Sequence, residues 1–241
     1  MLLGVPERAT PHAARDGHTA AQSIAEGIRY VARDQVLLGS MLLDLFAVFF
    51  GGATALLPVF ATTILHVGPV DFGLLRSASA AGSLLAALVA SRFLPQRRAG
   101  QVLLAVIAGF GISMVVFGLS RSLPLSLAAL FVAGLCDGTS VVIRRAILRL
   151  ASPEAMRGRI AAVKSVFVGS SNELGAFESG VAASLLGASA AVWGGGLVTL
   201  GIVAVTAWYA PQLRRLDLVS LAQVGPSAET DPTRSGVSRT A

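Results

Sequence analysis

Of the charged side chains inside the long apolar runs of this sequence, six are its first candidates for chemistry: Asp44, Arg76, Asp137, Arg144, Glu173 and Glu178. A charged group that faces lipid costs several kcal/mol, so these residues are expected to face protein or a water-filled cavity. A carboxylate held away from bulk water can alternate between charged and neutral forms, which suits proton loading and release. The pattern therefore indicates the handling of ions or solutes within a membrane.

Other kinds of chemistry lack their residues. The three histidines, His12, His18 and His66, all lie outside the apolar runs, and Cys136 is the single cysteine. This excludes an intramolecular disulfide, a paired-cysteine metal motif and a serine–histidine protease within the membrane. No nucleotide-binding loop is present. We therefore predict a protein that is not an enzyme, with no catalytic residues, no metal and no cofactor.

The composition indicates a membrane protein. Hydrophobic residues make up 54% of the 241 positions and charged residues only 13%, with a mean hydropathy of +0.73. A soluble domain carries roughly 25% charged residues. Lysine and arginine outnumber aspartate and glutamate by 19 to 13, but no basic stripe with interleaved aromatics is present, so nucleic acid is not an expected partner.

The apolar runs predict the fold class: an all-α polytopic membrane protein. A bilayer core about 30 Å thick needs roughly 20 apolar residues per helix. Six segments meet this need: Val36–Ala61, Phe72–Val89, Gln101–Leu119, Leu123–Leu148, Ile160–Leu186 and Ala188–Ala210.

Polar segments are predicted to flank this bundle. Residues 1–22 lack the apolar core of a signal peptide and are predicted to be a disordered cytoplasmic lead. Residues 23–35 alternate apolar and charged side chains, which is typical of an amphipathic helix on the membrane surface. The bundle then occupies residues 36–210, and residues 211–241 form a polar cytoplasmic tail.

The arginines and lysines predict the orientation. With the N-terminus inside, all of them except Arg76 and Arg121 fall in or beside cytoplasmic segments. Such an asymmetry places both termini in the cytoplasm and agrees with an even number of spans.

The charges also divide the six spans into two sets of three. The third and sixth spans contain no charged residue, whereas the other four do. We therefore expect the third and sixth to face lipid and the others to face inward, as in a 3+3 inverted repeat.

Four stretches carry a family resemblance. Asp137–Arg144, together with Ser152–Arg159, resembles the end of helix ten and the following loop in the major facilitator superfamily. Ser165–Gly180 and Leu42–Gly52 resemble the branch that contains enterobactin exporters and drug-efflux proteins. The resemblance implies that the six helices are the C-terminal half of a twelve-helix exporter in a bacterial inner membrane.

The sequence departs from the family in two respects. Ser91–Gly100 keeps the basic residues and a glycine of the loop signature after helix eight, but has no aspartate. The N-terminal half is also absent, although the substrate cavity of the family lies between two bundles. We therefore expect a second six-helix bundle as partner, either a missing N-terminal half or a second copy of this chain.

Depth along the helices predicts the site. At 1.5 Å per residue, Glu173 lies about 18 Å into its span, near the midplane, and is the predicted proton-coupling group. The alternative for Glu173 is a fixed ion pair with the absent half. Asp44 and Asp137 reach a similar level of the inner vestibule, where Ser140 and Asn172 are assigned to the same substrate cavity. The two aspartates could equally tether helices through hydrogen bonds.

Further charged residues are predicted at the two ends of the bundle. Arg76 and Glu178 both lie toward the outer side, where they could form an interface ion pair. A cytoplasmic gate is assigned to four residues at the inner end: Arg144, Arg157, Gly158 and Arg159. Arg144 is expected about 10 Å from Asp137, with its side chain extended to the cytoplasmic mouth. Arg157 and Arg159 flank Gly158 in a predicted inner loop, where a simple topology signal would explain them as well as a gate does.

These features together predict one half of a membrane transporter. Its activity would be the proton-coupled export of a small amphipathic solute such as a siderophore or drug, with the lipid bilayer, the solute and protons as partners. The alternative is a non-transporting membrane subunit or the truncated remnant of a twelve-helix exporter.

Overall fold

The computed structural model describes three long stretches of the chain, residues 53–92, 98–151 and 157–210. It also describes Arg29, Gly39, Leu42, Leu43, Leu45, Arg214 and residues 216–218. The helices are α3 (Ala53–Val59), the π-helix η1 (Phe60–Ile64), α4 (Pro69–Arg92), α5 (Ala99–Leu119), α6 (Leu123–Ala151), α7 (Arg157–Leu186) and α8 (Ala188–Tyr209). No strand occurs in these residues, so the all-helical prediction is confirmed for the described part of the chain.

Four of the described helices, α4, α5, α6 and α8, are long and apolar enough to cross a membrane. All four coincide with predicted spans and begin and end close to the predicted boundaries. α7 covers the predicted fifth span and has 30 residues, but its charged and polar residues make it less apolar than the other four. In the first predicted span, Gly39, Leu42, Leu43 and Leu45 are helical, and the last part of the span lies in α3 and η1. The predicted lead and surface helix lie outside the described residues apart from Arg29.

The first described helix changes its winding near Pro58. Pro58 lies inside α3 and cannot donate a backbone hydrogen bond, which is a common cause of irregular helix geometry. The next turn is a π-helix, in which the amide of Leu65 donates to the carbonyl of Phe60 at 3.1 Å. The hydroxyl groups of Thr62 and Thr63 donate to the carbonyls of Pro58 at 3.0 Å and Val59 at 2.6 Å. These bonds satisfy carbonyl groups that regular winding would have paired.

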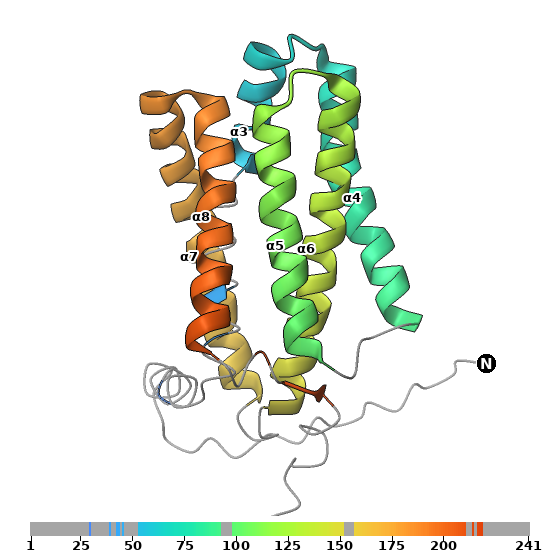
Figure 1. Cartoon of the computed structure of the whole chain (residues 1–241), viewed down its shortest axis with the longest axis vertical. Helices are drawn as coiled ribbons and strands as arrows, with labels where there is room; N and C mark the ends of the chain where they lie inside the picture. Colours follow the sequence, from blue (N-terminus) through green and yellow to red (C-terminus); the bar gives the residue numbers. More distant parts are fainter. Residues whose placement is uncertain are drawn as a thin grey trace, which may run out of the picture.

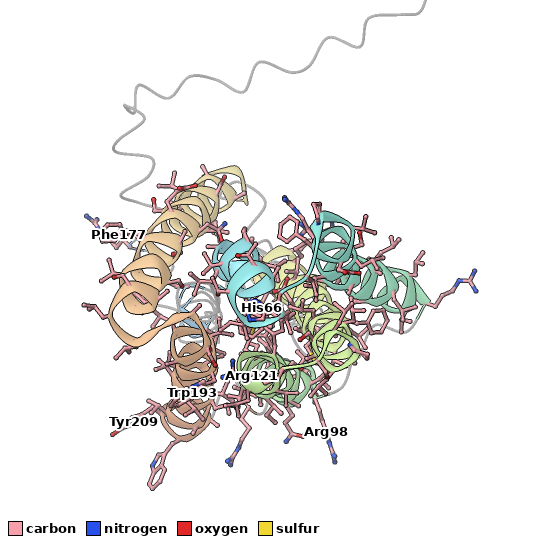
Figure 2. The ribbon with its side chains drawn as sticks, turned by 90° about the horizontal axis from the view of Figure 1, so that it is seen from above. His66, Arg98, Arg121, Phe177, Trp193 and Tyr209 are labelled. Carbon is pink, nitrogen blue, oxygen red and sulfur yellow. The ribbon has the colours of Figure 1, made fainter. Side chains whose placement is uncertain are left out.

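The helices run side by side and alternate in direction (Figure 1). α4 packs on α6, α5 packs on both α6 and α8, and α7 packs on α8 and α3. Seen from above, α5 and α8 lie on one side, α3 lies on the other, and α4 and α7 occupy the two flanks (Figure 2).

Small residues allow the closest helix contacts. A Cβ atom on Gly134 of α6 would overlap the carbonyl of Ser79 on α4, so these two backbones touch directly. The Ser83 hydroxyl strengthens this contact by donating to the Gly134 carbonyl at 3.0 Å. A Cβ atom on Gly118 of α5 would lie 2.6 Å from the backbone nitrogen of Trp193 on α8. Such close approach is how helices associate in lipid, where no hydrophobic force drives them together.

Two apolar clusters hold the ends of the bundle. One contains Phe60 and Phe117, whose ring centroids lie 4.4 Å apart, together with Leu75 and Leu130. The other surrounds Leu103 at the start of α5, at the opposite end, and includes Ile143 and Ile147 of α6. Both clusters include residues of α6, which carries polar candidates, whereas only the first cluster includes a residue of α7, the partly buried Ala183.

Candidate functional site

The central feature of the candidate site is an ion pair on α6. Nη2 of Arg144 lies 4.0 Å from Oδ1 of Asp137, and the arginine side chain is 5% exposed whereas the aspartate is 51% exposed. The predicted separation of about 10 Å is wrong for the charged groups, because helical side chains lean toward the N-terminus of their helix. The long Arg144 side chain thus extends back along α6, away from the predicted cytoplasmic mouth.

The hydroxyl of Ser140 is directed at the backbone of this same turn. Ser140 is buried, and its Oγ donates to the carbonyl of Asp137 at 2.8 Å. Thr139 makes a similar bond to the carbonyl of Leu135 at 2.8 Å. Ser140 therefore lies beside the ion pair, but its proton is engaged within α6.

Glu173 and Asn172 lie on the exposed face of α7. The buried positions of this helix include Ser171, Gly175 and Ser179, which follow the four-residue spacing of one helix face. Glu173 lies two residues from Ser171 and Gly175, and so on the opposite face, away from the contacts with α8 and α3. Phe177, one turn later, points outward from the bundle (Figure 2).

The predicted pair of Arg76 and Glu178 is not formed within this chain. Arg76 is exposed on α4, and Glu178 is half-buried on α7. These helices occupy opposite flanks of the bundle in both views (Figures 1 and 2). Their positions along the helices could be predicted from the sequence, but their positions around the bundle could not.

The remaining predicted site residues are only partly described. Arg157, Gly158 and Arg159 form the first turn of α7 instead of a loop, because the helix begins before the predicted span. Gly158 is exposed, and the side chains of Arg157 and Arg159 are not among those that the structure describes. Asp44 also lies outside the described residues. Among the residues that are described, no three His, Cys, Asp or Glu side chains come together as a possible metal site.

One feature that sequence reasoning missed lies beyond α8. Leu216 and Leu218 are buried against the start of α5, within a segment predicted to be a polar tail. In the sequence, the two leucines that flank Asp217 are the only indication of this buried segment. Two apolar residues are too few to show the periodicity of a helix or a strand.

Comparisons with known proteins agree with the family resemblance. A family described as transmembrane secretion effectors, in the major facilitator superfamily, matches residues 5–236. An enterobactin exporter from Citrobacter koseri is 26% identical over 204 residues, which cover 84% of this chain and 48% of that protein. The chain thus spans about half the length of this relative. No solved structure matches the chain.

Proposed function

Because the chain belongs to the transmembrane secretion effector family of the major facilitator superfamily, we propose that this multi-pass membrane protein is one half of an exporter. The exporter moves a small amphipathic solute outward across the bacterial inner membrane in exchange for protons. The enterobactin exporter among its relatives favours a siderophore or drug as the solute class. Both chain ends lie in the cytoplasm.

The helix packing supports a 3+3 inverted repeat. In such a repeat, each of the first three helices is equivalent to one of the last three: α3 to α6, α4 to α7 and α5 to α8. A contact between two helices should therefore recur between their equivalents. The contact between α4 and α6 then becomes that between α7 and α3, and the contact between α5 and α6 becomes that between α8 and α3. All four contacts are present.

The observation that carries the proposal is the exposed face of α7. Glu173 lies on that face, opposite the contacts of α7 within the bundle. A carboxylate exposed to lipid near the midplane is costly, so the face is expected to line a wet cavity or to meet protein. A second six-helix bundle, opposite this one, would complete such a cavity, with Glu173 as its proton-carrying group.

The ion pair of α6 supplies the second part of the proposed site. The half-exposed carboxylate of Asp137 can interact with a solute, while buried Arg144 fixes its position. Ser140 and Asn172 complete the proposed cavity, together with Asp44. Arg157, Gly158 and Arg159 then belong to the cytoplasmic gate at the start of α7.

Glu173→Gln tests the proton-coupling role, with Glu178→Gln as a matched control on the same helix. The glutamine keeps the shape of Glu173 but cannot release a proton. In inverted membrane vesicles that contain the chain and its second bundle, we expect Glu173→Gln to abolish solute accumulation driven by a proton gradient. Glu178→Gln should retain most of it. If Glu173→Gln vesicles keep the same proton dependence as the parent, the coupling role is wrong.

A further inference from the structure

Residues 216–218, which follow α8 in the chain, pack against the start of α5. We propose that residues 216–218, here called the clasp, form a conformational device with the first turn of α5. The two segments engage and release as one unit, and Asp217 provides the carboxylate that holds them together.

Two hydrogen bonds join the clasp to α5. The backbone amide of Arg98 donates to Oδ1 of Asp217, a residue 119 positions away, and the amide of Gly100 donates to the carbonyl of Leu216 at 3.3 Å. Arg98 is the N-cap of α5 and provides no side-chain cap of its own. The first amides of a helix lack partners within it, and a carboxylate there is favourable toward the helix dipole. Asp217 therefore acts as a cap from a distant part of the chain.

Apolar contacts hold the clasp on its other side. Leu216 is 7% exposed and Leu218 is 4% exposed, in a cluster that contains Leu103 of α5, Ile147 of α6 and Val203 of α8. The clasp thus ties together the ends of three helices that meet at this end of the bundle.

The backbone at the contact indicates a constrained position. Arg98 has φ 57° and ψ 32°, a left-handed conformation that is unfavourable for a residue with a side chain. A residue keeps such an unfavourable backbone conformation only when the contacts around it hold the backbone in place. The hydrogen bonds of Arg98 and Gly100 to the clasp are contacts of this kind.

The charges of the two segments also favour contact between the clasp and the start of α5. The connection Ser91–Gly100 contains three arginines and no carboxylate. Asp217 brings a negative charge from beyond α8 to the end of this connection. Release of the clasp would leave the first turn of α5 uncapped and free the end of the connection, so the two segments should open together as a local unit. Opening of the clasp can be measured without any transport activity.

Hydrogen–deuterium exchange on the full chain in detergent micelles tests the clasp, with peptides that cover residues 98–104 and 213–220. In the parent, both peptides should be protected and should exchange with similar opening free energies. Asp217→Ala should speed exchange in both by about two- to thirty-fold, the range expected for loss of a helix cap. Asp217→Asn keeps an oxygen that can accept the bond and should stay closer to the parent than Asp217→Ala.

Two controls separate the clasp from general unfolding. Asp71→Ala changes an acidic residue in the first turn of α4 and should leave both peptides unchanged. A peptide from the middle of α5, where it packs on α8, should keep its protection in every variant. The proposal is overturned if Asp217→Ala leaves the exchange of residues 98–104 unchanged, or if residues 213–220 exchange without protection in the parent.

Discussion

Single side chains on α6 show how helix geometry decides the arrangement of charges. The Arg144 side chain follows the general lean of helical side chains toward the N-terminus and meets Asp137 two turns earlier. This brings a positive charge into the buried face of α6 and leaves the carboxylate half-exposed. Spacing alone placed both residues on one face, but the separation of their charged groups depends on how the side chain extends.

A double-mutant cycle of Asp137→Asn and Arg144→Gln measures this pair. Because one partner is half-exposed, solvent screens the interaction, and we expect a coupling free energy of about 0.5–1 kcal/mol. Thermal or denaturant unfolding in detergent provides the four stabilities. Additive effects of the two substitutions would show that the pair does not contribute to stability.

At the scale of helices, contact between backbones determines which neighbours are possible. α4 and α6 approach so closely that the carbonyl of Ser79 occupies the place of a side chain on Gly134. By contrast, a Cβ atom on Gly169 of α7 would meet nothing within 4 Å. Glycine is therefore required for the close packing of α6 on α4, whereas at Gly169 of α7 there is space for a larger side chain.

Gly134→Ala and Gly169→Ala form a matched pair of substitutions. Gly134→Ala should destabilise the bundle by about 1–3 kcal/mol, because α4 and α6 must separate to admit the methyl group. Gly169→Ala should be neutral or stabilising by up to ~1 kcal/mol, since alanine favours the helix more than glycine. Thermal unfolding of the two variants in one detergent tests this. Equal effects would contradict the close packing of α4 on α6.

The sequence predicted where the helices begin and end better than it predicted which helices pack against one another. Long apolar runs determine where a chain can cross a membrane, and α5, α6 and α8 lie close to their predicted bounds. The opposite positions of Arg76 and Glu178 follow from packing between helices distant in sequence, which depth does not reveal. The clasp was missed for a related reason, since the burial of Leu216 depends on surfaces of α5 and α6.

At the scale of the whole molecule, the two flanking helices present large apolar side chains outward. Val70 and Leu84 are exposed on α4, and Phe177 and Leu185 are exposed on α7. On the proposed function, the α7 face meets a second bundle, whereas the outer face of α8 meets lipid. Trp208, which is 84% exposed, belongs to that outer face of α8.

Cysteine cross-linking in membranes distinguishes these two faces. With Cys136, the single cysteine, replaced by alanine, Phe177→Cys should cross-link to a second six-helix bundle. Trp208→Cys, under the same conditions, should not, because lipid covers its face. Cross-linking from Trp208→Cys but not from Phe177→Cys would place the partner on the wrong side of the bundle for the proposed cavity.

The most direct measurement of the central claim is proton movement driven by a solute gradient in proteoliposomes. The vesicles contain the chain with its second bundle and enclose a pH-sensitive dye, and an amphipathic siderophore or drug is applied on one side only. Exchange of solute for protons predicts a pH change inside the vesicles that requires the chain and the solute gradient together. If intact, correctly inserted assemblies move no protons with any member of this solute class, the protein is not a proton-coupled exporter of such solutes.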